Sequence, residues 1–169
     1  MKDQLLEQFF NNPMKQFGVR ELSRLTRLDT KTVMKYLKDL VKEKIIIKNT
    51  KKGSFPTYES NRMATIYKFE KSHHLIKKVL GSGVIEYLEE KIKPKAIVLF
   101  GSVAKGTYYS ESDVDLFIHG AYHRVDLGRY EQKIGYKISI LAEENLKELS
   151  SGLLENIRRG RIMVGELKI

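Results

Sequence analysis

Two acidic residues, Asp113 and Asp115, stand one residue apart in an otherwise apolar segment, "DVDLFI". The alternation over Val114–Ile118 predicts a β-strand, on which residues i and i+2 project to one face roughly 6.5–7 Å apart. Two unpaired carboxylates at that separation repel each other and raise each other's pKa, so such a pair indicates a cation site. Oxygen ligands with room for waters and phosphates are typical of Mg²⁺, with Mn²⁺ as the alternative ion.

A second feature lies upstream of the aspartates. The apolar run Ala96–Phe100 follows Pro94 and predicts a buried strand, which ends at Gly101-Ser102. Glycine allows a tight strand-to-helix turn, and the free amides of that turn, together with the Ser102 hydroxyl, suit a phosphate group. Lys105 follows one helical turn later, where its ammonium group could reach the same anion. The sequence therefore predicts an anion site next to the cation site.

An apolar strand, Gly-Ser, a ten-residue spacer and Asp-Val-Asp-Leu occur together in this chain. This combination resembles the signature of the DNA polymerase beta-type nucleotidyltransferase superfamily. Within that superfamily the short length resembles the minimal nucleotidyltransferases. The resemblance covers roughly residues 84–169, and its specific motif lies in Phe100–Leu116.

The resemblance implies a concrete active site. Gly101, Ser102 and Lys105 would bind the triphosphate of an NTP. Asp113 and Asp115 would be the catalytic carboxylates that bind Mg²⁺. A nucleoside monophosphate, most simply AMP, would pass to a hydroxyl group while pyrophosphate leaves, and positioning and charge neutralisation would supply most of the catalysis.

The sequence departs from the family pattern at a third position. Active members usually carry another carboxylate on a neighbouring strand, often as general base for the acceptor. Here Val125–Ile134 predicts the intervening helix and "YKISIL" the strand, which puts Ser139 at the expected acid position. Serine replaces a carboxylate poorly, and Asp126 or Glu131 could substitute only with unusual geometry. The domain could therefore transfer nucleotides slowly, bind them without turnover, or serve as a scaffold.

The N-terminal third carries most of the positive charge. The chain has a formal net charge of +10, and residues 1–62 hold 14 Lys and Arg against 7 Asp and Glu, a net +7. Apolar spacing predicts helices over 3–11, over 19–28 with Leu22, Leu25 and Leu28 buried, and over 32–44 with Met34 among the apolar positions. Two short strands, 45–48 and 57–60, flank the turn "TKKGSFP".

This order of elements resembles the winged helix-turn-helix family of DNA-binding domains over roughly residues 3–62. In that family the third helix enters the major groove and the wing touches the DNA backbone. The resemblance implies that the start of the third helix and the basic wing contact DNA, through Thr30, Lys31, Thr32, Lys35, Lys48, Lys51 and Lys52. A winged helix can instead serve as a protein-protein or dimerisation module, and both interpretations stay open on the sequence.

The sequence as a whole predicts a two-domain α/β (α+β) protein. A winged helix-turn-helix domain occupies 1–62, a helical connector 63–83, and a minimal nucleotidyltransferase domain with a small mixed sheet 84–169. The chain has no cysteine, which excludes disulfides and thiolate metal sites, and it has no apolar run that could span a membrane. We therefore expect a soluble cytoplasmic protein.

Two functions fit these features. The first is an enzyme that transfers an NMP from Mg-NTP to a protein or nucleic-acid acceptor, as antitoxin-type minimal nucleotidyltransferases do to partner toxins. The second is a DNA-binding transcriptional regulator whose degenerate nucleotidyltransferase domain binds nucleotide or partners without turnover, with a dimer as a common assembly of winged-helix proteins. A purely structural adaptor is the third alternative.

Overall fold

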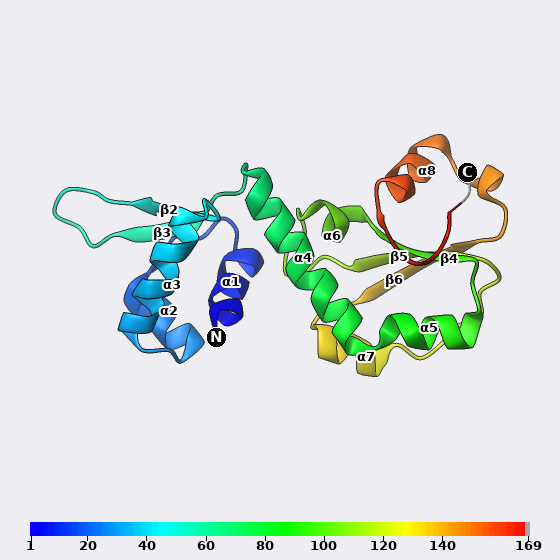
Figure 1. Ribbon diagram of the computed structural model, residues 1–169, viewed down its shortest axis with the longest axis horizontal. Coiled ribbons are helices and arrows are strands. Elements are labelled where there is room, and N and C mark those ends of the chain that lie inside the picture. Colours follow the sequence, from blue (N-terminus) through cyan, green and yellow to red (C-terminus); the bar gives the residue numbers. More distant parts are fainter. Residues whose placement is uncertain (168–169) are drawn as a thin grey trace. The chain divides into compact units, whose positions relative to one another are not determined.

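The computed structural model describes residues 1–167. By its internal contacts the chain divides into two compact units, one covering Met1–Lys71 and one beginning at Ser72. Each unit has its own apolar core. Figure 1 shows the ribbon of both units with their helices and strands labelled.

The division falls within one helix, α4 (Thr65–Ser82), in the region that the sequence predicted as a helical connector. The helix continues through Gly81 and Ser82. It ends before Gly83, whose φ of +85° lies in the left-handed region that favours glycine. Neither α4 nor any other helix within residues 1–167 combines the length and apolar character needed to cross a bilayer.

The first unit contains three helices and a three-stranded antiparallel sheet, in the order β1-β3-β2. Its elements are α1 (Lys2–Asn11), β1 (Phe17–Gly18), α2 (Val19–Thr26), α3 (Thr30–Lys42), β2 (Ile46–Asn49) and β3 (Thr57–Ser60). The three helices and the two flanking strands confirm the sequence prediction. The two-residue strand β1 was not predicted, because it is defined only by its pairing with Thr57 and Tyr58.

The third helix of this unit buries one narrow stripe. Val33, Leu37 and Leu40 are fully buried in the core of the first unit. Met34, one position round the helix from Val33, is 52% exposed, and Leu25 of α2 is 49% exposed. The prediction of a buried Leu25 was therefore wrong, and Met34 does not belong to the core.

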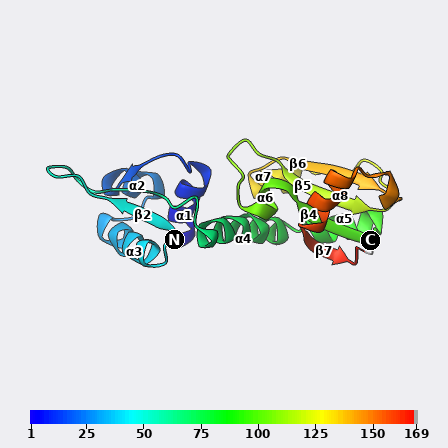
Figure 2. The same ribbon diagram turned by 90° about the horizontal axis from the view of Figure 1, so that it is seen from above.

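The second unit is built on a mixed four-stranded sheet in the order β6-β5-β4-β7, seen edge to edge in Figure 2. Strand β4 runs antiparallel to both β5 and β7, whereas β5 and β6 are parallel. After α4 its elements are α5 (Val84–Ile92), β4 (Ala96–Phe100), α6 (Gly101–Lys105), β5 (Val114–His119), α7 (Gly128–Ile134), β6 (Ile138–Glu143), a 3₁₀ turn (Leu146–Glu148), α8 (Ser151–Arg158) and β7 (Arg161–Gly165).

Side chains of the central strands alternate between two apolar layers, because successive residues of a strand point to opposite faces. On one face Leu99 and Leu116 pack with Leu88 of α5 and with residues of α7. On the other face Phe117 packs with Ile157 of α8. Figure 1 shows α8 on one side of the sheet and α5 and α7 on the other. Both faces of the sheet are thus packed against helices.

Candidate functional site

The two aspartates lie at the start of β5. The strand begins at Val114, so Asp113 immediately precedes it and Asp115 is its second residue. Asp115 pairs in register with Phe100, the last residue of β4. Because residues directly opposite each other share a face, Asp115 lies on the side of the sheet that carries Phe100 and Phe117, the side covered by α8.

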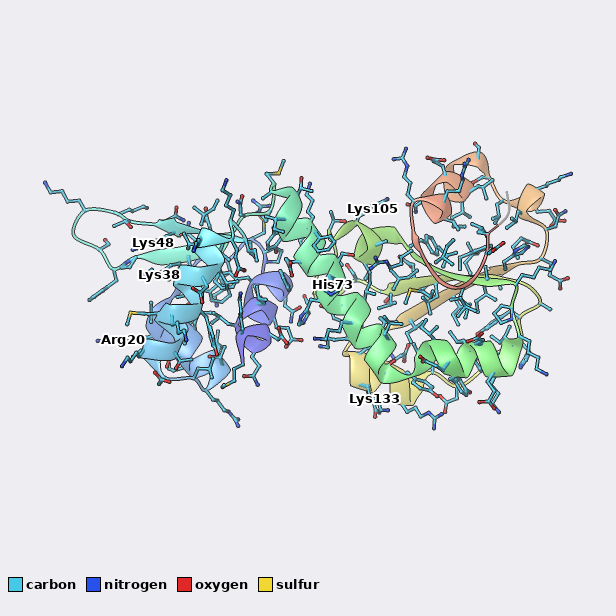
Figure 3. All side chains as sticks on the ribbon, viewed as in Figure 1. Arg20, Lys38, Lys48, His73, Lys105 and Lys133 are labelled. Carbon is cyan, nitrogen blue, oxygen red and sulfur yellow. The ribbon has the colours of Figure 1, made fainter. Side chains whose placement is uncertain are left out.

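Gly101 brings the start of α6 against the Asp115 carboxylate. Its φ is +73°, and a Cβ at this position would overlap Oδ2 of Asp115 and approach Cγ to 3.1 Å. Any other residue would therefore push the carboxylate away. Ser102, which follows, is part-buried, and its carbonyl accepts a hydrogen bond of 2.9 Å from the Thr107 amide, which closes the short helix. Lys105 is exposed at the other end of α6 (Figure 3).

The electrostatics of the pair follow from burial and from like charge. Removal of Asp115 from water raises the pKa of its carboxyl, and the nearby charge of Asp113 raises it further. Asp113 itself is exposed. A divalent cation at this position would relieve both effects, so the donor set fits Mg²⁺ bound by two carboxylates, with waters and phosphate oxygens as the remaining ligands.

The position next to Asp115 on β6 carries no acid. In the parallel β5-β6 pair Asp115 is aligned with Ser139, which is exposed. Ser139 thus stands beside Asp115 at the position where the family resemblance calls for a third carboxylate. Within residues 1–167 there is also no cluster of three or more His, Cys, Asp or Glu side chains able to hold a metal.

The two acids considered as substitutes have other partners. Glu131 Oε1 accepts a 2.9 Å hydrogen bond from the Ile138 amide, and Oε2 lies 3.1 Å from Lys137 Nζ. The backbone bond and then the lysine hold the pKa of Glu131 below its usual range. Asp126 Oδ1 accepts a 3.0 Å hydrogen bond from the Gly128 amide, just before α7. Both acids thus position α7 and the start of β6.

A cavity of about 400 Å³ opens beside Asp113. It is bounded by the loop before β5, by α7 and by the turn into β6, and its polar lining includes Ser110, Glu111, Ser112, Gln132 and Lys137. Ser102, Lys105 and Asp115 do not line it. Sequence reasoning missed these lining residues, because they come from three segments that share no motif or periodicity. The cavity lies on the β6 side of the carboxylates, whereas the Gly-Ser turn lies on the β4 side.

In the first unit the predicted DNA contacts fall on exposed surface with one exception. Thr30, Lys31 and Lys35 on α3 are exposed, as are Lys48 on β2 and Lys51 and Lys52 in the following segment. Thr32 is part-buried, and both its amide and its hydroxyl donate to the Asp29 carboxylate, at 2.9 and 2.6 Å. Asp29 is the N-cap of α3, so the hydroxyl of Thr32 serves to start this helix.

Comparison with known families matches residues 82–157 to the nucleotidyltransferase domain. That span runs from the end of α4 into α8 and includes β4, the Gly-Ser turn, both aspartates and the strand that carries Ser139. The match covers somewhat less than half of the chain, and the mixed α/β architecture of this region is consistent with it. Comparison with curated proteins and with solved structures gives no match.

Proposed function

We propose that the nucleotidyltransferase domain transfers an NMP from Mg-NTP to a hydroxyl group. The observation that carries this proposal is the position of the Asp115 carboxylate, which lies against Gly101 and shares its environment with Asp113. Ser102 and the neighbouring amides would bind the triphosphate with help from Lys105. The acceptor oxygen would attack the α-phosphorus, the bond from that phosphorus to the bridging oxygen would break, and pyrophosphate would leave.

Bound Mg²⁺ would supply charge neutralisation for the triphosphate and its leaving group. The protein's part is to hold two carboxylates in place for the cation. Gly101 keeps Asp115 close to the turn, and pairing of β5 between β4 and β6 fixes the backbone on both sides. The hydroxyl proton of the acceptor would pass to solvent, because the neighbouring position on β6 is Ser139.

The test combines calorimetry with each NTP, with and without Mg²⁺, and transfer of label from an α-labelled NTP to protein, nucleic acid or water. Asp113→Asn together with Asp115→Asn should lower Mg-dependent binding or transfer by about 10²-fold or more, since preorganised charge contributes several kcal/mol to such sites. Asp126→Asn is the matched control, because its carboxylate serves a turn. The proposal would be contradicted if the wild type bound NTP equally well with and without Mg²⁺ and the double variant bound NTP with the same affinity.

We further propose that the first unit is a winged helix-turn-helix that binds duplex DNA. The exposed lysines on α3, on β2 and in the segment between β2 and β3 support this, together with the net charge of +7 over residues 1–62. Binding measured by anisotropy should weaken steeply with salt. Lys35→Gln should reduce the slope of log K against log salt by about 1, in the manner of one lost phosphate contact. A flat salt response of the wild type would refute DNA binding.

A second candidate function is a DNA-binding regulator whose nucleotidyltransferase domain holds nucleotide without turnover. The specific observation in its favour is Ser139 beside Asp115, with Glu131 and Asp126 committed to other partners. This function predicts site-specific DNA binding that survives Asp113→Asn and Asp115→Asn, with Mg-NTP binding but no labelled product. Formation of labelled product on any acceptor would exclude this second function and support the transferase.

A further inference from the structure

Among the large apolar side chains that are exposed in the first unit, two line one hollow. Met34 of α3 is 52% exposed, and Phe55, in the segment between β2 and β3, is 91% exposed. Both line one cavity of about 430 Å³, whose lining also includes Gly18, Val19, Thr30 and Pro56 and the charged Arg20 and Glu21. Exposed apolar groups that gather at one hollow, rather than being scattered singly, mark a contact surface.

Met34 lies in the middle of a polar row. Residues four apart on a helix are neighbours on its surface, so Thr30, Met34 and Lys38 follow one another along the exposed side of α3. Lys31 and Lys35 form the next row, and both are exposed. The apolar side chain is therefore flanked by cations along the helix.

The charges around the hollow favour a polyanion. Arg20 lines the hollow, and the exposed Lys31 and Lys35 neighbour its lining residues Thr30 and Met34 along α3. Figure 3 labels Arg20 and Lys38 in this unit. Glu21, which also lines the hollow, forms an ion pair of 2.8 Å with Lys15, and Asp29 accepts the capping bonds of α3. A predominantly apolar protein partner would leave these cations desolvated and unpaired, whereas duplex DNA provides phosphates for them.

Duplex DNA also offers one apolar group in its major groove, the C5-methyl of thymine. We propose that Met34 contacts a thymine methyl and thereby determines part of the DNA sequence that this unit selects, with Phe55 as a second apolar contact from the β2-β3 segment. This inference rests on the proposed DNA binding and adds a specificity determinant to it. The lysines around it would bind phosphates and would not distinguish sequences.

The test uses the full chain and lets the protein select its own DNA site. Duplexes are selected by the wild type from a randomised library, and each thymine of the selected site is then replaced, one at a time, by deoxyuridine, which lacks only the methyl group. At one position the wild type should lose about fourfold in affinity, the factor that corresponds to burial of one methyl group. Met34→Ala should bind both duplexes equally, and Met34→Leu should restore the preference.

Leu25→Ala is the matched control, because Leu25 has nearly the same exposure as Met34 but does not line the hollow. It should keep the fourfold preference. If a site is selected but Met34→Ala retains the wild-type loss on deoxyuridine, the inference is wrong while DNA binding stands. If no DNA binds, the DNA-binding proposal itself fails. If Met34→Ala and Phe55→Ala weaken self-association and leave DNA affinity unchanged, the hollow belongs to a second copy of the chain.

Discussion

Strands β5 and β6 are parallel neighbours, yet they carry different side chains at one pair of aligned positions. Asp115 on β5 is a part-buried carboxylate held against Gly101, and its partner in register on β6 is the exposed Ser139. The sheet thus offers two neighbouring positions with the same backbone geometry, and only one carries an acid. Under the proposed function, β5 would supply a ligand for the Mg-bound triphosphate, whereas β6 would supply no base for the acceptor.

The largest expected effect comes from an acid placed on β6. Ser139→Asp should accelerate release of labelled NMP from an α-labelled NTP, with water as acceptor, by about 10²-fold, the lower range for a positioned general base. Its rate should rise with pH as the new carboxyl ionises. Ser151→Asp, which adds the same charge in the first turn of α8, is the control and should change nothing. If the rate is unchanged in a variant that still binds Mg-NTP, the missing carboxylate on β6 does not limit transfer.

Disruption of the close contact between Gly101 and the Asp115 carboxylate should have the next largest effect. In Gly101→Ala the new Cβ would meet the Asp115 carboxylate, which must rotate away, and the left-handed φ adds about 1–2 kcal/mol of strain. We expect Mg-NTP affinity to fall at least tenfold and the melting temperature to drop. Gly152→Ala in α8 is the control, because a Cβ there meets nothing within 4 Å. A variant with wild-type affinity would mean that the Asp115 carboxylate does not need its place against Gly101.

These contacts mark the limit of what the sequence could predict. Strand β4 was predicted to the residue, because its five apolar residues are bounded by Pro94 and Gly101. Local order along the chain also placed the Gly-Ser turn, Asp115 and Ser139 on the elements where the structure has them, whereas Asp113 lies one residue before β5. The contact of Asp115 with Gly101 and the cavity beside Asp113 arise between segments far apart in sequence, which no local pattern records.

The first unit shows the same limit in a different form. Helical periodicity identified α3, but a helix with five apolar positions can bury only those that face its neighbours. Val33 and Leu37 are buried, whereas Met34 remains outside. Which apolar residue stays exposed depends on where α1, α2 and the sheet lie, and that is decided by tertiary packing.

The smallest expected effect is on the stability of the protein, and it tests the difference between Asp115 and Ser139 in the absence of substrate. Burial and the charge of Asp113 raise the pKa of Asp115, so between its unfolded and folded pKa values the folded protein binds more protons than the unfolded chain. The free energy of unfolding should therefore fall as pH rises through this interval. Above the interval the ionised carboxylate destabilises the folded protein by a constant amount. Asp115→Asn should melt higher than the wild type at pH 7, and the difference should vanish below the unfolded pKa.

Addition of Mg²⁺ should reverse the order of the melting temperatures of the wild type and Asp115→Asn. A cation that binds only the folded state stabilises it by mass action, so millimolar Mg²⁺ should raise the melting temperature of the wild type at pH 7 and leave Asp115→Asn unchanged. Ser139→Asn is the matched control on β6, because it places an amide beside Asp115 without removing a charge. If Asp115→Asn instead melts lower at pH 7 in the absence of Mg²⁺, the carboxylate is stabilised by its surroundings and is not held at a cost for a cation.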